Sequence, residues 1–218
     1  MFSNLQTLKE KGYTPSTIFD IGAHQGSWTD ECMKVYKDSE YHLFEAIEYS
    51  ELDRFRELQN VHIGKGVILN ETVTEVDWFE MRNTGDSMFR EKTRYFNNPT
   101  VIRRPTTTLD IVLKDSEITG SVFIKIDCQG AEIPILKGAT KLLEATDFVL
   151  LEIPFFGQYN AGVPTFLEHI QFMDSIGFIP YDILEHHVMK GFLMQVDILF
   201  IRKTHSLNKT VQDDMFVW

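Results

Sequence analysis

The sequence predicts an α/β fold with a doubly wound, mostly parallel sheet. One observation is the β-branched and aromatic run Thr17–Ile21, which is followed by Gly22, Gly26 and a segment with helical spacing. A second is that the same order of strand, glycine turn and helix start recurs over Val122–Glu132. A third is that short β-rich runs alternate with helical segments. The main strands are expected near residues 17, 41, 61, 122, 148, 178 and 195.

The composition favours one domain and excludes several classes of partner. The chain has 218 residues with 43% hydrophobic content and no linker-like segment, which predicts a single domain over 1–218 with a core of about 16–203 and a tail of 204–218. The formal charge of −11 argues against nucleic acid or an anionic membrane surface as the main partner. No signal-peptide pattern and no membrane-length apolar run are present, and two Cys make no disulfide framework, so a cytoplasmic protein without a membrane span is expected.

The stretch Thr17–Trp28 has the features of a nucleotide-type ligand site. Its strand leads into Gly22 and Gly26, where the chain has to turn sharply beneath a ligand. Ser27 stands three residues before Asp30, as in a capped helix start. The spacing Gly-x-x-x-Gly differs from the Gly-x-Gly-x-x-Gly of dinucleotide sites, which weakens the alternative of a nicotinamide-dependent oxidoreductase.

Four acidic residues lie at or near the ends of buried strands: Asp20, Glu45, Asp127 and Glu152. Ligands of open α/β sheets bind beyond the carboxyl ends of the strands, so these carboxylates are expected to face one crevice. An acid at the end of the second strand typically accepts hydrogen bonds from a ribose diol, and Glu45 stands 25 residues beyond Asp20. Glu132 lies in a helix start and is expected to act there as a cap.

Three further segments are expected to border or extend the crevice. The polar stretch 82–99 is a candidate lid or a mobile surface loop, with the Ser87 hydroxyl as a candidate ligand contact. The alternation over 73–81 predicts an added strand, in a hairpin with the third strand. His186 and His187 stand in the connection between strands expected over 178–184 and 195–202, and their imidazoles titrate near neutral pH.

Several motifs together resemble those of the FkbM family of S-adenosylmethionine-dependent methyltransferases. They are Thr17–Trp28, Phe44–Glu45, Thr108–Asp110, Ile124–Glu132 and Ile135–Ala139. The resemblance extends over about residues 16–203. It implies a three-layer, Rossmann-like methyltransferase sheet of seven strands, six of them parallel and the last inserted antiparallel.

The resemblance also implies S-adenosylmethionine as the cofactor and the hydroxyl of a small molecule or sugar as the methyl acceptor. The backbone from Gly22 to Gly26 would line the methionine part, with Asp20 ordering the turn or receiving the amino group, and Glu45 would take the ribose hydroxyls. The residues expected to bind the cofactor are Asp20, Gly22, Ala23, His24, Gly26, Trp28, Glu45, Ala46, Ser87 and Asp127. The sequence does not decide whether the protein forms a homo-oligomer.

The general base for such a transfer is not fixed by these patterns. The catalytic candidates are Asp127, His186 and His187, with His24, Glu152 and Tyr159 as alternatives. A divalent metal held by Asp127 and Glu152 would rest on two carboxylates alone, which is an incomplete signature, so no metal is expected.

Three positions depart from the family's pattern. His24 stands where the family usually has Asn, Ala46 where it has Pro, and Gln129 where it has Glu. The change at Gln129 removes a carboxylate near the expected reaction centre and puts a mechanism with paired acids in doubt. A non-catalytic cofactor-binding protein is therefore the alternative to a methyltransferase.

Overall fold

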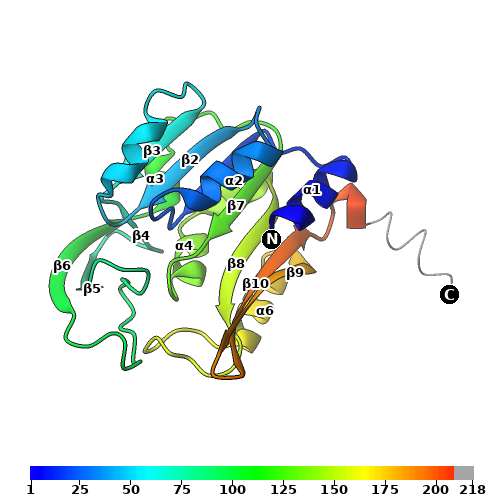
Figure 1. The fold of residues 1–218 in the computed structure, drawn as a ribbon. Helices are drawn as coiled ribbons and strands as arrows, with labels where there is room; N and C mark the ends of the chain where they lie inside the picture. The colour runs from blue at the N-terminus through cyan, green and yellow to red at the C-terminus, as the bar shows by residue number, and fades with distance from the viewer. Residues whose placement is uncertain (209–218) are drawn as a thin grey trace.

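The computed structural model describes residues 1–208 and contains a seven-stranded sheet (Figure 1). Its order is β3-β2-β1-β7-β8-β10-β9. Strand β10 is antiparallel to both β8 and β9, while the other pairings are parallel, so six strands share one direction. The strands are β1 (Thr17–Ile21), β2 (Glu40–Glu45), β3 (Val61–Lys65), β7 (Val122–Ile126), β8 (Thr146–Pro154), β9 (Phe178–Met189) and β10 (Phe192–Arg202). The expected fold class is confirmed.

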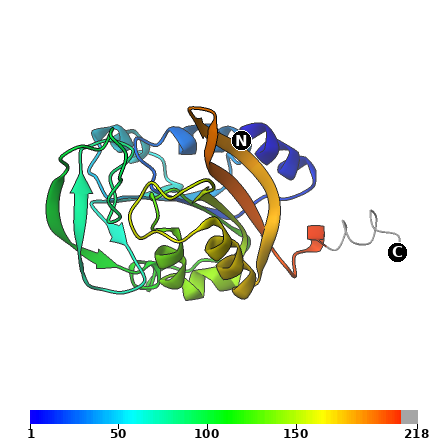
Figure 2. The same cartoon turned by 90° about the horizontal axis from the view of Figure 1, so that it is seen from below.

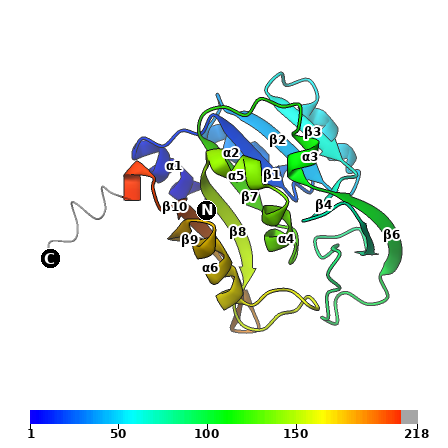
Figure 3. The same cartoon turned by 180° about the vertical axis from the view of Figure 1, so that it is seen from behind.

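Helices cover both faces of this sheet, which gives three layers (Figure 2). One apolar cluster joins the sheet to α1 (Phe2–Glu10), α2 (Ser27–Val35) and the 3-10 helix η1 (Ser50–Phe55). The second cluster lies on the opposite face, where α3 (Leu109–Val112), α4 (Glu132–Lys137), α5 (Thr140–Ala145) and α6 (Phe166–Ser175) pack (Figure 3). Because the sheet is covered on both sides, every residue of β1 and β7 is buried, as their continuous apolar runs predict.

The register of the strands brings the acidic residues to one edge of the sheet. Ile21 of β1 pairs with Phe44 and Ile126, so Glu45 and Asp127 follow at the same level. Glu152 of β8 lies one residue beyond the partner of Ile126 and pairs directly with Asp197 of β10. Strands β2, β7 and β8 therefore present carboxylates at the carboxyl end of the sheet.

A second sheet of three strands extends from this edge, in the order β4-β6-β5 (Figure 1). Its strands are β4 (Ile68–Leu69), β5 (Glu75–Glu80) and β6 (Thr100–Thr107). The added strand over 73–81 exists, but it pairs with β6 and not with the third strand. The expected third strand itself divides into β3 and β4 around Gly66, whose φ of 75° is incompatible with an extended strand.

The hairpin of β9 and β10 is longer than the sequence pattern predicts. Lys190 and Gly191 form its turn with φ angles of 51° and 83°, the two positive values that a tight hairpin turn with a right-handed twist requires. His186 and His187 therefore lie within β9 and not in the connection. Side chains alternate across a strand, so these two neighbours point to opposite faces.

The part of the expected tail that is described packs against the core. The His205 ring lies 5.8 Å from the Tyr13 ring and 5.4 Å from the Phe148 ring. The apolar end Met215–Trp218 lies outside the described residues. Between residues 1 and 208, no helix is both long and apolar enough to cross a membrane.

Candidate active site

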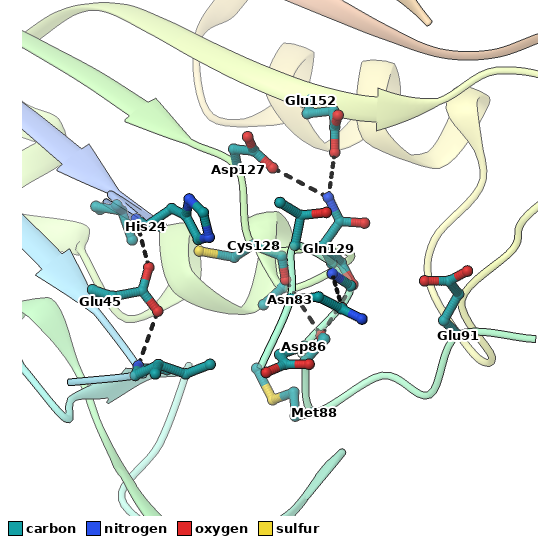
Figure 4. A pocket seen from close by; sticks show the side chains of 18 of the residues that line it. His24, Glu45, Asn83, Asp86, Met88, Glu91, Asp127, Cys128, Gln129 and Glu152 are labelled. Carbon is teal, nitrogen blue, oxygen red and sulfur yellow. Dashed lines mark hydrogen bonds between the residues drawn. The ribbon is translucent and has the colours of Figure 1, made fainter. Parts of the chain in front are cut away.

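A cavity of about 610 Å³ lies at the carboxyl ends of β1, β2, β7 and β8. Its walls come from the glycine turn after β1, the loop after β2, the accessory sheet, the covering segment (residues 82–96) and the β9–β10 hairpin. Figure 4 shows Glu45 and His24 on one side of this cavity, and Asp127, Gln129 and Glu152 on another. Six residues expected to bind the cofactor line it: Gly22, His24, Glu45, Ala46, Ser87 and Asp127.

Glu45 is held in place by two backbone N–H groups. Its Oε2 accepts from His24 N at 2.7 Å and its Oε1 from Ile47 N at 2.9 Å (Figure 4). Burial raises the pKa of Glu45, and the two N–H groups act in the opposite direction by favouring the ionised carboxylate. Each oxygen keeps a lone pair for a second donor, so two hydroxyl groups of a ligand could bind here.

His24 adopts a left-handed backbone conformation with φ of 48°. Asn and His are among the non-glycine residues enriched in this region, which explains how His24 fits a position where the resemblance expects Asn. Its ring lies 4.7 Å from the Tyr49 ring, edge to face. The conformation directs the His24 N–H at Glu45, so the side-chain difference leaves this contact intact.

The glycine turn passes very close to the neighbouring strand end. Gly22 has φ of 75°, and a Cβ at this position would lie 1.9 Å from the carbonyl oxygen of Asp127. Gly22 N also donates to Phe44 O at 2.9 Å, which ties the turn to β2. Only glycine satisfies both the conformation and the spacing.

A left-handed backbone alone costs an alanine about 1–2 kcal/mol. Replacing Gly22 with Ala is expected to lower the free energy of unfolding by more than this. The added clash with Asp127 should also displace the turn and weaken ligand binding. Urea unfolding measures the first effect and calorimetric titration with S-adenosylhomocysteine the second. Gly12→Ala is the matched control, because Gly12 has φ of 94° and a Cβ added there would have no atom within 4 Å. Equal losses for the two variants would contradict the role of the close approach.

Asp20, one of the residues expected to bind the cofactor, does not line the cavity. Its side chain is fully buried beneath the turn, where Oδ1 accepts from Lys125 Nζ at 3.0 Å and Oδ2 from the Thr29 hydroxyl at 2.6 Å. Lys125 also donates to Gly22 O at 2.9 Å. Burial opposes the charge of Lys125, but Asp20 and Asp127 keep its pKa above the ordinary value. Asp20 therefore orders the turn, the first of the two roles expected for it.

Three other expected cofactor residues also lie outside the lining of the cavity. Ala23 is buried, and its N–H donates to Phe44 O at 3.1 Å. Gly26 is the N-cap of α2 with φ of 81°, so the expected Ser27 cap is wrong. Trp28 points away and lines a second, smaller cavity next to Lys125.

The covering segment (residues 82–96) lies over the cavity, where the lid was expected. Ser87 is buried, and its hydroxyl lies 3.1 Å from Gln129 O and 3.3 Å from Cys128 O while accepting from Phe89 N. Backbone bonds from Lys92 to Tyr159 O and from Ala161 to Arg90 O attach the segment to the loop after β8. The Ser87 hydroxyl thus holds the segment against the turn after β7.

Gln129 joins two carboxylates on the acidic side of the cavity. Its Nε2 donates to Glu152 Oε2 at 2.8 Å and to Asp127 Oδ1 at 3.3 Å (Figure 4). Burial raises the pKa of Glu152, and the nearby Asp127 and Asp197 raise it further. The Gln129 amide therefore donates to both Asp127 and Glu152, whose carboxylates repel each other. A Glu at position 129 would add a third carboxylate and increase this repulsion.

Glu132 was expected to cap the helix that it begins, but its carboxylate binds the turn that precedes α4. Its Oε1 accepts from Cys128 N at 3.0 Å and Gly130 N at 3.2 Å, which fixes the turn that carries Gln129. Burial raises the pKa of Glu132 to about 7, although the backbone donors act in the opposite direction. His169 lies 4.0 Å from its second oxygen.

Only one of the two expected histidines reaches the cavity. His186 is exposed and does not line it, because the alternation of β9 turns its side chain the other way. His187 lines both cavities, and its Nε2 lies 3.2 Å from Asp197 Oδ1 and 3.8 Å from Glu152 Oε1. The hydrogen bond with Asp197 raises the pKa of His187.

Sequence reasoning missed Asp197, Trp78 and Tyr49. Asp197 has no local signal and meets Glu152 only through the insertion of β10 beside β8. Trp78 and Tyr49 line the cavity, and in the described part of the chain Trp78 Nε1 and Tyr49 Oη are buried without a hydrogen-bond partner.

The three-layer arrangement and the strand order define a Rossmann-like fold. Two solved structures with the same fold have low sequence identity to this chain. A methyltransferase FkbM from Methylobacillus flagellatus is 14% identical with a TM-score of 0.53, and the match covers 84% of this chain and 43% of that one. The 1,6-didemethyltoxoflavin-N1-methyltransferase of Burkholderia thailandensis, bound to 1,6-didemethyltoxoflavin and S-adenosylhomocysteine, is 11% identical with a TM-score of 0.51, and the match covers 92% of this chain and 77% of that one. The chain thus spans less than half the length of the first. No curated protein matches the sequence.

The family profile of the methyltransferase FkbM domain matches residues 20–180. The chain therefore belongs to the FkbM methyltransferase family. This membership confirms the family that the sequence motifs indicated.

Proposed function

We propose that this protein transfers the methyl group of S-adenosylmethionine to a hydroxyl group of a small molecule or sugar. The observation that carries the proposal is one cavity with two chemically different ends. Glu45 offers a diol-binding carboxylate at one end, and Asp127 stands with Glu152 at the other. The cavity volume lies in the range of small-molecule sites.

The residues present fit the adenosine part of the cofactor. The Glu45 oxygens would accept from the two ribose hydroxyls. Ile47, Ile68 and Trp78 form a small apolar cluster beside Glu45, which suits a planar base.

S-adenosylmethionine supplies an electrophilic methyl group on a sulfonium. The acceptor oxygen has to lie about 3 Å from that methyl group and lose its proton as the carbon–oxygen bond forms and the carbon–sulfur bond breaks. Asp127 borders Gly22 directly and is half-exposed toward the cavity, so it is the group assigned to receive the proton. His186 has no part in this step because it lies outside the cavity.

Radiolabelled S-adenosylmethionine, incubated with the protein and a panel of sugars, phenols and metabolite extracts, tests the proposal. The label is expected to move to a hydroxyl-containing product. Asp127→Asn should lower the rate about 100-fold or more, the typical contribution of a general base, and leave binding of S-adenosylhomocysteine nearly unchanged.

Binding of S-adenosylhomocysteine without transfer to any acceptor would favour a non-catalytic cofactor-binding protein, and label found on nitrogen would overturn the hydroxyl assignment. A thermal shift with NAD but none with S-adenosylhomocysteine would reject the cofactor.

A further inference from the structure

Three possible metal ligands converge where the two cavities meet. They are Glu152 of β8, His187 of β9 and Asp197 of β10, and their donor atoms all lie within 4.8 Å of one another. His187 Nε2 is 3.2 Å from Asp197 Oδ1 and 3.8 Å from Glu152 Oε1. Metal bonds of about 2.1 Å place neighbouring ligand atoms about 3–3.5 Å apart. Small side-chain rotations would therefore bring the three donor atoms to distances that suit one bound ion. The three strands are hydrogen-bonded neighbours, which makes the site rigid.

The hydrogen bonds around Glu152 leave one of its oxygens directed at this point. Oε2 accepts from Gln129 Nε2 and from Gln195 Nε2, each at 2.8 Å. Oε1 lies 3.8 Å from His187 Nε2, which in turn forms a hydrogen bond with the buried Asp197 carboxylate. Outer hydrogen bonds that orient a carboxylate in this way are typical of metal sites. Gln129 and Gln195 thus have the placement of outer-sphere residues.

The surroundings of the cluster are rich in carboxyl groups. The Asp127 carboxyl group lies next to Glu152, with Gln129 Nε2 donating to both, and is the third acidic group there. Lys125, the nearest buried cation, is bound to Asp20 at 3.0 Å and lies 3.9 Å from Asp127. Ions can reach the cluster, because Glu152 and His187 line both cavities.

We propose that Glu152, His187 and Asp197 bind a divalent cation of the Mn²⁺ or Zn²⁺ type beside the acceptor site. One imidazole and two carboxylates suit these borderline ions and leave coordination positions open toward the cavity. The sequence favoured no metal because it suggested only Asp127 and Glu152 as ligands. This site uses a different set, which the position of β10 assembles.

The role of the cation rests on the proposed function, whereas its binding does not. A carboxylate such as Asp127 is a weak base for an alcohol, whose proton is held far more tightly. A metal-bound oxygen loses its proton much more readily, as bound water does. The cation would therefore bind the acceptor hydroxyl, and Asp127 would take the proton.

Titration of the EDTA-treated protein (residues 1–218) with Mn²⁺, followed by the EPR signal of the free ion and repeated by calorimetry with Zn²⁺, tests the site. One ion per chain is expected to bind. Asp197→Asn, Glu152→Gln and the half-exposed His187→Ala should each weaken binding about 10- to 100-fold or more. Glu40→Gln is the control, because Glu40 with His42 and His62 forms a second, remote group of possible ligands and its change should leave the affinity unaltered.

Circular dichroism and binding of S-adenosylhomocysteine show whether each variant is folded. No Mn²⁺ or Zn²⁺ binding by the wild-type protein, or binding that is lost in Glu40→Gln and kept in His187→Ala, would overturn the inference. Metal binding at the expected residues without methyl transfer would leave the site in place and reject the proposed function. Methyl transfer that EDTA leaves unchanged would reject the catalytic role of the ion.

Discussion

Asp20→Asn is expected to lower the free energy of unfolding by about 3–5 kcal/mol, the cost of leaving a buried charge without its partner. Asp20 is fully buried and Lys125 nearly so, and their charged atoms lie 3.0 Å apart. The Asn side chain keeps the shape and an acceptor for Thr29 but leaves the Lys125 ammonium with Gly22 O and, at 3.9 Å, the half-exposed Asp127 carboxylate. For a chain of this size the melting temperature should fall by about 6–20 °C.

Urea unfolding of Asp20→Asn, Lys125→Met and the double variant measures this pair. The double variant should lose less than the sum of the single ones, because it contains no unpaired buried charge. Asp30→Asn is the matched control, since the Asp30–Arg54 pair is half-exposed at 2.5 Å and should contribute at most about 1 kcal/mol. Additive losses in the double variant would show that the two charges do not support each other.

The main sheet could be predicted from the sequence because its central strands have simple local signals. A strand buried on both faces needs a continuous apolar run, and Thr17–Ile21 and Val122–Ile126 both have one. Parallel strands also end at the same level, so the position of Glu45 and Asp127 at one edge followed from the strand boundaries. The pairing of β5 with β6 had no such signal, because 19 residues separate Glu80 from Thr100.

The orientation of individual side chains was beyond the sequence. Asp20 and Glu45 both stand at strand ends, yet Asp20 is the second-last residue of β1 and points beneath the turn, whereas Glu45 ends β2 and reaches the cavity. His186 and His187 differ by one position, and only the register of β9 decides which faces Glu152. A shift of one residue exchanges the two faces of a strand, so no composition or spacing argument separates such neighbours.

Glu45→Ala is expected to weaken binding of S-adenosylhomocysteine at least about 100-fold. Two charge-assisted hydrogen bonds to a ribose contribute about 1.5–3 kcal/mol each, and the variant also leaves the His24 and Ile47 N–H groups without their acceptor. Glu45→Gln keeps one acceptor oxygen and should lose less. Calorimetric titration gives both constants, with Glu48→Ala as the control, because Glu48 is exposed on the same loop and does not line the cavity.

The comparison of adenosine with adenine isolates the ribose contact. Glu45→Ala should weaken adenosine binding and leave adenine binding unchanged, because only adenosine carries the diol. Since burial raises the pKa of Glu45 and the ionised carboxylate is the better acceptor, wild-type affinity should fall as the pH decreases through that pKa, and Glu45→Gln should remove this dependence. Normal binding of S-adenosylhomocysteine by a folded Glu45→Ala variant would show that the ribose lies elsewhere in the cavity.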